Sequence, residues 1–338
     1  MRTSTALVLA GLLALLGLPA PAVHALEATP DGTTSSAAPS GRRVLAISVD
    51  GLNPTALRRL GPRRTPTLHR LVDEGAATLN ARTEHEVTVT LPNHTSMVTG
   101  RRVAADHGGH GVTWNDDLPG RTVHGAAGHR VASMFTVVHR SGGESAVFAG
   151  KSKFSLFPHS WPRAVDRFTY DERPLALVRA ARRDLLRHDR ELTFLHLRLP
   201  DSAGHASGFM TAPYLQAVRR TDALIGKLVR TIDAHRRLAE DLVVVLTADH
   251  GGRGDGHQDP ARLANYRIPF LAWGAGVRAA NLYALNPRRE PPERTRPSYA
   301  ARRQPIRNGD LANLVTSLLG LRAVPGSGIG ARQDLVVR

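Results

Sequence analysis

The sequence predicts an α/β fold in which a mostly parallel central sheet is covered by helices on both faces. Near-continuous apolar runs have the length and composition of strands buried on both sides, and they lie at residues 44–49, 192–199 and 242–246, with a weaker one at 145–149. Segments with apolar residues at helical spacing lie between them, at residues 65–74, 175–186 and 214–238. Strands that alternate with helices in this way are typical of parallel sheets.

The N-terminal segment has the features of a secretory signal peptide. Arg2 gives a positive start, residues 6–18 form an uncharged apolar run, and Val23-His24-Ala25 matches the small-x-small pattern of cleavage sites. The apolar run is too short to span a membrane. We therefore expect cleavage after Ala25 and a secreted or extracytoplasmic protein, with an uncleaved membrane anchor as the alternative.

The rest of the chain divides into two parts after this signal peptide, which covers residues 1–25. Residues 26–41 are rich in Ala, Ser, Thr, Pro and Gly, which predicts a disordered segment. Residues 42–338 are enough for a single catalytic domain with a sizeable core. Within this domain, residues 286–305 are dense in Pro and Arg and predict a surface loop, before a last short helix at 313–321.

The composition excludes several kinds of chemistry. The 338 residues include no cysteine, so disulfides, thiolate catalysis and Cys-ligated zinc are excluded. The formal net charge is +16, and nearly all of the basic residues are arginines scattered along the chain. Such a surface attracts anionic substrates, cell-wall polymers or membrane surfaces. Because known nucleic-acid-binding motifs are missing and aromatics are few, we expect no specific nucleic-acid recognition. We predict no stable protein partner.

Carboxylates follow the three strongest strand candidates. Asp50 comes after the first, Asp201 after the second and Asp249 after the third. In open α/β sheets, ligands bind beyond the carboxyl ends of the strands. Three unpaired acids gathered there would repel one another, and a divalent cation would remove that repulsion.

Histidines accompany two of these acids. His205 follows Asp201 by four residues, so one helical turn would present both on one face. Asp249 and His250 form an adjacent oxygen and nitrogen ligand pair, and His257 follows on the same loop. Oxygen and nitrogen ligands without thiolates suit zinc, and less often manganese or iron.

Residues 90–100 supply a candidate nucleophile. Pro92 and Gly100 predict a helix that starts near Asn93 and ends at Gly100. Thr90 would then lie just ahead of a helix N-terminus, where free N–H groups favour anions. A threonine hydroxyl is a weak nucleophile alone, but coordination to a metal would lower its pKa enough to attack phosphorus.

Together these segments resemble the alkaline phosphatase superfamily, and most closely its nucleotide pyrophosphatase/phosphodiesterase branch. The matching pieces occur in the family's order, and they are Asp50-Gly51, Thr90-x-Pro92-Asn93-His94, Val98-Thr99-Gly100, Asp201-x-x-Gly204-His205 and Asp249-His250-Gly251. Each piece is weak alone, but five in order over residues 44 to about 275 form a specific signal. The resemblance implies an alkaline-phosphatase-like fold for the catalytic domain.

The resemblance also implies two zinc ions per chain, with manganese or iron as alternatives. The residues implied for one metal are Asp50, Thr90, Asp249 and His250, and those for the other are Asp201, His205 and a third histidine. Thr90 would form a phospho-threonine intermediate, and Asn93 would help to hold a phosphate oxygen.

The third histidine departs from the pattern of the branch. It is expected well downstream, nearer the C-terminus, yet no histidine follows His257 in this chain. His257 is therefore the candidate by elimination. Asp255 or Asp259 could take its place or act from behind it.

Two lysines are candidate substrate-binding residues. Arginine has replaced lysine almost everywhere, yet Lys151 and Lys153 lie two residues apart. A compact ammonium suits contact with phosphate or with a buried carboxylate. Chance is the alternative explanation for their spacing.

These features predict a secreted two-metal hydrolase of phosphate esters, with phosphodiester or nucleotide pyrophosphate bonds as the first choice of substrate. A phosphomonoesterase and a phosphonate hydrolase are the alternatives. Sulfate esters are disfavoured because their usual hydrolysis needs a formylglycine formed from a Cys or Ser ahead of a Pro-Arg motif, and we identify no such formylglycine site. The non-enzyme alternative is a basic exported binder of an anionic polymer, which would need no aligned set of metal ligands.

Overall fold

The most buried strands form the middle of the sheet. In the computed structural model, which describes residues 41–338, β1 (Arg43–Val49) pairs in parallel with β5 (Leu192–Leu197) on one side and with β6 (Leu242–Thr247) on the other. Every residue of these three strands is buried. Strands of this kind need cover on both faces, which is why they occupy the centre.

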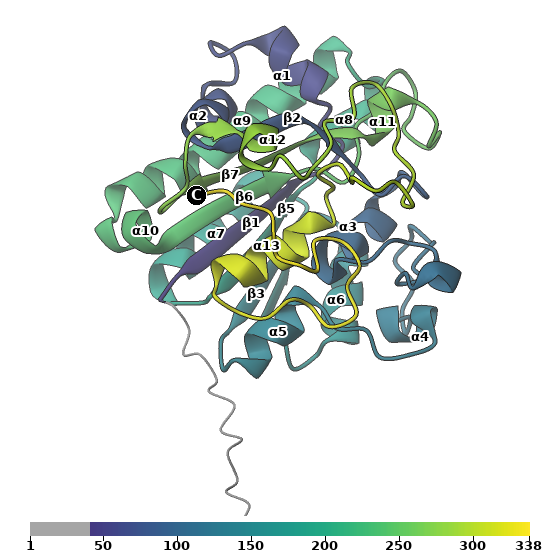
Figure 1. The fold of residues 1–338 in the computed structure, drawn as a ribbon. Helices are drawn as coiled ribbons and strands as arrows, with labels where there is room; N and C mark the ends of the chain where they lie inside the picture. Colours follow the sequence, from purple (N-terminus) through teal and green to yellow (C-terminus); the bar gives the residue numbers. More distant parts are fainter. Residues whose placement is uncertain (1–40) are drawn as a thin grey trace, which may run out of the picture. The chain divides into compact units, whose positions relative to one another are not determined.

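The sheet is parallel except at one strand. Its other members are β2 (Ala76–Arg82), β3 (Ser145–Ala149), β4 (Arg167–Tyr170), β7 (Arg267–Gly274) and β8 (Ala280–Asn281). The eight strands lie in the order β4-β3-β5-β1-β6-β7-β2-β8 (Figure 1). Only β7, among the strands of residues 41–338, runs antiparallel to its neighbours β6 and β2.

Helices pack on both faces of the sheet (Figure 1). They are α1 (Pro54–Leu60), α2 (Pro66–Glu74), α3 (Thr90–Thr99), α4 (Val123–Ala127), α5 (Met134–Arg140), α6 (Leu156–Ser160), α7 (Pro174–Arg187), α8 (Leu199–Ser207), α9 (Ala212–Ala234), α10 (Arg236–Asp241), α11 (Leu263–Tyr266), α12 (Leu282–Leu285) and α13 (Asp310–Leu318). Helix α13 packs on α3 and α5, and it contacts β1 and β6. Helix α9 packs against α2, α7, α8 and α10.

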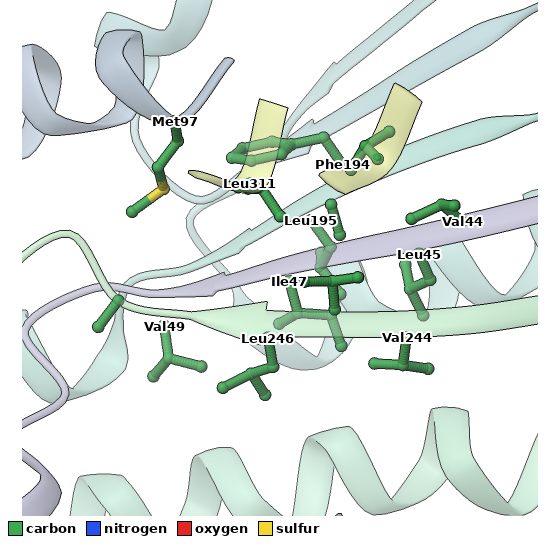
Figure 2. Close-up of a cluster of buried hydrophobic side chains, with 14 of the residues drawn as sticks. Val44, Leu45, Ile47, Val49, Met97, Phe194, Leu195, Val244, Leu246 and Leu311 are labelled. Carbon is green, nitrogen blue, oxygen red and sulfur yellow. The ribbon is translucent and has the colours of Figure 1, made fainter. Parts of the chain in front are cut away.

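The core anchors helix α3 over the centre of the sheet. Figure 2 shows Met97 of α3 and Leu311 of α13 on one side of the strands, with Val49, Val244 and Leu246 on the other. All five side chains are buried. Burying one such side chain contributes roughly 1.5–3 kcal/mol. This packing fixes α3, whose first residue is Thr90, near the ends of β1 and β6.

The observed elements agree with most of those predicted. The predicted strands at 44–49, 145–149, 192–199 and 242–246 correspond to β1, β3, β5 and β6, and the predicted helices at 65–74 and 175–186 to α2 and α7. The last predicted helix is α13, which starts three residues earlier than expected. The predicted helix at 214–238 is divided into α9 and α10, which meet at His235.

One predicted helix boundary is wrong. The helix expected to start near Asn93 is α3, and it begins at Thr90. Pro92 lies within the first turn of α3, where its missing N–H removes no intrahelical hydrogen bond. Thr90 is therefore the first residue of the helix instead of lying just ahead of it.

The predicted signal peptide at residues 1–25 and almost all of the segment predicted at 26–41 lie outside the described residues. These predictions and the domain boundaries therefore stay predictions. Among the helices of residues 41–338, none combines the length and the hydropathy that crossing a bilayer requires.

Candidate metal and active site

Three buried carboxylates meet at the carboxyl ends of neighbouring strands. Asp50 directly follows β1, Asp249 comes two residues after β6, and Asp201 lies in the first turn of α8, after β5. None of the three is more than 2% exposed. Because β5, β1 and β6 are adjacent and parallel, these ends lie at one edge of the sheet.

The backbone at Gly51 holds the three ends together. The N–H of Gly51 donates to Asp249 Oδ1 over 3.0 Å, and the N–H of Asp201 donates to the carbonyl of Asp50 over 3.1 Å. Gly51 has a φ of 69°, and a Cβ there would lie 3.0 Å from the Cα of Asp201. Both the left-handed conformation and the close approach require glycine.

Histidines complete two groups of metal-ligand type. One group is Asp50, Asp249 and His250, and the other is Asp201, His205 and His257; within each group, one ligand atom per residue lies within 4.8 Å of the others. Asp255 and Asp259 belong to neither group among residues 41–338. The structure thus brings His257, the candidate chosen by elimination, beside Asp201 and His205.

Unpartnered buried atoms test whether these residues fit a metal. Asp50 Oδ1, Asp201 Oδ1, Asp249 Oδ2 and His250 Nε2 are buried without a hydrogen-bond partner. His250 Nε2 lies 3.5 Å from Asp50 Oδ1, 3.8 Å from Asp201 Oδ1 and 3.2 Å from Asp249 Oδ2. Buried polar atoms are normally paired, and crowded carboxylate oxygens repel. A cation in each of the two groups would give all four atoms a partner, so the residues fit metal binding.

Backbone carbonyls orient two of the imidazoles. Nδ1 of His250 lies 2.9 Å from the carbonyl of Gly251, and Nδ1 of His257 lies 2.6 Å from the carbonyl of Thr88. A carbonyl only accepts, so each Nδ1 carries the proton and each Nε2 presents a lone pair. Nε2 of His257 faces Nε2 of His205 at 3.0 Å. Metal-ligating histidines typically have this arrangement.

Lys151 adds positive charge to the carboxylates. Its Nζ lies 2.6 Å from Asp50 Oδ2, 2.7 Å from Asp201 Oδ2 and 3.3 Å from Thr90 Oγ1. Burial alone would lower the pKa of Lys151, but Asp50 and Asp201 outweigh it and raise the pKa. One ammonium cannot neutralise three carboxylates, and burial together with Asp50 raises the pKa of Asp249 well above its usual value.

Lys151 and a metal would use different oxygens. The ammonium contacts the Oδ2 atoms of Asp50 and Asp201, whereas the unpartnered atoms are their Oδ1 atoms. The contacts of Lys151 with these carboxylates are therefore compatible with metal binding by the same residues.

Thr90 borders an open cavity of about 490 Å³ beside these groups. The residues that line the cavity are Thr90, Asn115, Lys151, Lys153, Arg198, Asp201, Ser202, His205 and Ala206. Thr90 is also the first residue of α3, and the N-terminus of a helix favours anions. The cavity thus joins a hydroxyl, a ligand group and three cationic side chains.

The two predicted substrate-binding lysines both line this cavity. The ammonium of Lys153 donates to the backbone carbonyl of Asn115. Burial, reinforced by the charge of Lys151, lowers the pKa of Lys153. Lys153 therefore tethers the segment around Asn115 to the active-site edge of the sheet.

The structure corrects the role predicted for Asn93. Asn93 is buried, and its Oδ1 accepts from the N–H of Glu84 over 2.9 Å and from Asn308 Nδ2 over 3.0 Å. Its Nδ2 donates to the carbonyl of Val87 over 2.6 Å. These bonds occupy the amide, and Asn93 does not line the cavity. Asn93 therefore supports the segment before α3 instead of contacting substrate.

Asn115 lies where Asn93 was expected to act. It lines the cavity, and its Oδ1 accepts from the N–H of Leu91 over 2.9 Å. This bond uses the Oδ1 acceptor, so the Nδ2 donor is the part of the amide that a ligand in the cavity could contact. From the sequence, residues 114–117 could line a pocket entrance or form a plain surface loop, but no pattern assigns Asn115 a contact with phosphate, because it is far from Thr90 along the chain.

His196 is a second residue that the sequence analysis missed. Its Nε2 lies 2.8 Å from Asp50 Oδ2, and its Nδ1 accepts from the N–H of Gly150 over 3.2 Å. His196 therefore donates to Asp50 and orients that carboxylate. The available signal was a histidine inside the otherwise apolar strand β5.

The fold and the site define this chain as a member of the alkaline phosphatase superfamily. Residues 44–308 match the type I phosphodiesterase / nucleotide pyrophosphatase family, so the chain belongs to that family. The family acts on phosphate esters. This confirms the predicted resemblance and the predicted fold class.

Solved structures share the fold at low sequence identity. Murine ectonucleotide pyrophosphatase / phosphodiesterase 5 is 17% identical with a TM-score of 0.63, covering 87% of this chain and 99% of that one. An alkaline phosphatase superfamily protein from Vibrio parahaemolyticus is 13% identical with a TM-score of 0.59, covering 88% and 71%. The lipoteichoic acid synthase LtaP of Listeria monocytogenes is 15% identical with a TM-score of 0.56, covering 87% and 75%.

Curated sequence relatives include GPI ethanolamine phosphate transferases. GPI ethanolamine phosphate transferase 1 of Yarrowia lipolytica is 33% identical over 153 residues, which cover 44% of this chain and 16% of that protein. The same enzyme of Saccharomyces cerevisiae is 31% identical over 153 residues, which cover 43% and 16%. The chain therefore matches only a small part of these longer relatives.

Proposed function

We propose that this chain is a metal-dependent hydrolase that cleaves phosphate esters through Thr90, with phosphodiester or nucleotide pyrophosphate bonds as its preferred substrates. The observation that carries the proposal is that Thr90 lines one cavity with Asp201 and His205 of one ligand group, and that Lys151 in the same cavity contacts Asp50 of the other group. Family membership supports the reaction class. In murine ectonucleotide pyrophosphatase / phosphodiesterase 5, a Thr-to-Ala variant is inactive and binds AMP, which supports a threonine nucleophile.

Two zinc ions are the proposed cofactors, with manganese or iron as alternatives. The residues proposed for one are Asp50, Thr90, Asp249 and His250, and those for the other are Asp201, His205 and His257. When bound, such metals stabilise charge on phosphate oxygens and favour the ionised form of a nucleophilic hydroxyl.

The residues of the chain would carry the reaction in two steps. Thr90 Oγ1 would attack phosphorus; an Oγ1–phosphorus bond forms, the bond to the leaving oxygen breaks, and a phospho-threonine remains. Lys151, 3.3 Å from Oγ1, favours the deprotonated hydroxyl. The Nδ2 donor of Asn115 and the N-terminus of α3 would hold the phosphate oxygens. Water would then attack phosphorus, release the phosphate product and restore Thr90.

The charge of the cavity supports the preferred substrates. Lys153 and Arg198 line it in addition to Lys151. Arg198 is paired with Glu172 over 3.2 Å, whereas Lys153 forms no salt bridge among residues 41–338. A substrate with a second negative group beside the reacting phosphate, such as a nucleotide pyrophosphate, would complement this edge. Phosphomonoesters and phosphonates remain the alternative substrates.

Transfer to an alcohol is the second candidate function, and the identity to the GPI ethanolamine phosphate transferases favours it. The first step would be the same, and an alcohol would replace water in the second step. The choice therefore depends on what attacks the phospho-threonine.

Export and contact with an anionic wall or membrane surface complete the proposal. They rest on the signal-peptide pattern of residues 1–25 and on the net charge of +16. The alternative explanation of the positive charge is that the chain binds an anionic polymer without catalysing a reaction. Such a binder would show affinity that falls steeply with salt and would contain no metal.

One set of assays tests these alternatives. Protein purified with zinc is incubated with bis(p-nitrophenyl) phosphate or p-nitrophenyl phosphate, with and without glycerol, and products are followed by absorbance and phosphorus NMR. We expect faster cleavage of the diester and release to water. Faster monoester cleavage would overturn the diester preference, and a glycerol phosphodiester product would favour transfer. No turnover by protein of verified metal content would contradict the enzymatic proposal.

A further inference from the structure

A second cavity lies at the opposite end of helix α3 from Thr90. Its volume is about 250 Å³. The charged and aromatic side chains that line it are Arg101, Arg102, His107, Arg289, Tyr299 and Arg307. No acidic residue lines it. Arg101 directly follows Gly100, the residue that ends α3. A ten-residue helix is about 15 Å long, so this cavity is separate from the one beside Thr90.

Arg101 is a buried guanidinium without a carboxylate partner. Only 8% of Arg101 is exposed. Of its five N–H donors, the Nη1 group donates to the carbonyl of Gly108 over 3.1 Å, and Nε is buried without any partner. Arg101 forms no salt bridge with the residues that the structure describes. Because burying an unpaired charge costs free energy, an anion bound beside Arg101 would stabilise the folded chain.

Arg307 is a second buried guanidinium without a carboxylate partner at this cavity, although each of its nitrogens has a neutral partner. It is 1% exposed, and its guanidinium donates to neutral acceptors, Gln304 Oε1 at 3.1 Å and the carbonyl of Pro297 at 3.0 Å. Within residues 41–338 it has no salt bridge. Its positive charge lowers the pKa of Glu84, but that carboxyl accepts from Tyr299 and does not line the cavity.

The other two arginines are held in place by carboxylates that lie outside the lining. Arg102 pairs with Glu86 over 2.5 Å, and Arg289 pairs with Asp310 over 3.0 Å and with Asp334 over 3.1 Å. The guanidinium carbons of Arg102 and Arg307 also lie 4.0 Å and 4.5 Å from the centre of the Tyr299 ring. These contacts fix the guanidiniums before any ligand arrives, which lowers the cost of binding.

We propose that this cavity is a second anion site, which binds a phosphate dianion either free or as the end group of a phosphomonoester. Guanidinium groups match the oxygens of phosphate, and the volume leaves room for a phosphate with a small substituent. The site is distinct from the Thr90 site and takes no part in bond cleavage.

The test counts bound phosphate in two cavity variants and in two control variants, of which Gly328→Ala controls for the loss of the glycine. Radiolabelled inorganic phosphate is measured by equilibrium dialysis against the metal-loaded full chain, and diester hydrolysis is assayed on the same samples. Arg101→Gln removes the unpaired guanidinium. Gly328→Glu adds a carboxylate at the cavity, where a Cβ meets nothing within 4 Å. Arg236→Gln is the charge-matched control, since the Arg236 side chain is 89% exposed.

We expect Arg101→Gln and Gly328→Glu each to bind one phosphate fewer than the wild type, or to bind it about tenfold more weakly. Arg236→Gln and Gly328→Ala should bind as the wild type does, and hydrolysis should change less than about twofold in all variants. Unchanged phosphate binding in both cavity variants would overturn the proposal, even if one of them folded poorly. Failure of the Thr90 proposal would instead appear in the hydrolysis assay.

A parallel titration identifies the source of the phosphate group. Glycerol 3-phosphate competes with the labelled phosphate in the wild type and in Arg101→Gln. If the Arg101-dependent site prefers glycerol 3-phosphate to phosphate, its ligand is a phosphomonoester; if it prefers phosphate, its ligand is the free anion. Either preference supports the site, whereas competition that does not depend on Arg101 contradicts it.

Discussion

The two ends of helix α3 bury charge of opposite sign. At its first residue, Thr90 lies 3.3 Å from the ammonium of Lys151, which contacts the buried carboxylates of Asp50 and Asp201, and several carboxylate oxygens of this site have no partner. Just past its last residue, Arg101 is buried with no carboxylate beside it. The helix dipole agrees with both ends, because an N-terminus favours phosphate oxygens and a C-terminus favours cations.

This contrast shows which charges in the molecule carry information about ligands. The chain has many arginines, and many of them are exposed, as is Arg236, which pairs with Glu240 over 2.7 Å on the surface. Such a pair contributes little and points to no ligand. A buried charge without a partner is costly, so its persistence indicates a group of opposite sign that binds there. By this argument the buried carboxylates beside Thr90 indicate bound cations, and the buried guanidinium of Arg101 indicates a bound anion.

Replacing the proposed nucleophile tests the role of the N-terminal end of α3 in catalysis. Thr90→Ala removes the only atom proposed to bond to phosphorus, so diester hydrolysis should fall by at least about a thousandfold. Metal content should stay nearly unchanged, because the carboxylates and imidazoles remain. Steady-state kinetics and elemental analysis measure the two effects. Near-normal rates in Thr90→Ala would reject the nucleophile, and Thr95→Ala, altered one turn away on the same helix, is the control.

Removing metal tests whether the carboxylates beside Thr90 bind a cation, because bound metal would raise the free energy of unfolding. A ligand present at about a thousand times its Kd stabilises the folded state by about 4 kcal/mol. Chelation should therefore lower the free energy of unfolding by that order, as measured by urea unfolding with and without added zinc. In Asp249→Asn the difference should shrink, because one carboxylate loses its charge. Identical unfolding curves for the wild type in both conditions would contradict metal binding by the folded chain.

Glu84 contacts Asn93 of α3 and Tyr299 of the second cavity, and its titration should change the free energy of unfolding with pH. Its backbone N–H donates to Asn93, and its carboxyl accepts from Tyr299. Burial raises the pKa of Glu84 from 4.5 to about 7. Between these values the folded chain keeps a proton that the unfolded chain has lost, so stability falls as pH rises, by up to about 3 kcal/mol.

The variant Glu84→Gln should remove this part of the pH dependence. Urea unfolding at pH 4.5, 6 and 8 measures it, and Glu240→Gln on the surface is the control. The wild type should lose stability over this range relative to Glu84→Gln. Parallel pH profiles of the wild type and Glu84→Gln would show that Glu84 titrates near its ordinary pKa.

The gathering of the three carboxylates at one edge of the sheet could be predicted, because its signals are local in the sequence. Asp50, Asp201 and Asp249 each follow an apolar strand, and neighbouring parallel strands bring their ends together. His205 is placed by helical spacing. The antiparallel strand β7 was not predicted, because one short apolar run does not reveal its direction or its partners.

The arginine cavity and the role of Asn115 could not be predicted, because both depend on segments brought together from distant parts of the chain. Arg101 and Arg307 are separated by about two hundred residues and look like every other arginine in this sequence. Asn93 was assigned from a motif, but its amide bonds to Glu84 and Asn308 become visible only in the folded chain. Sequence patterns predict ligands on strand ends better than they predict amide orientation.

The smallest expected effect concerns His196, which donates a hydrogen bond to Asp50. Its Nε2 lies 2.8 Å from Asp50 Oδ2, so its N–H orients a proposed metal ligand. Loss of such a bond typically lowers metal affinity ten- to a hundredfold. His196→Phe should show this loss in a zinc titration with a chromogenic chelator. His196→Gln, which can still donate from a similar position, should recover part of the affinity, because the effect acts through the hydrogen bond to Asp50 and not through the volume of the ring.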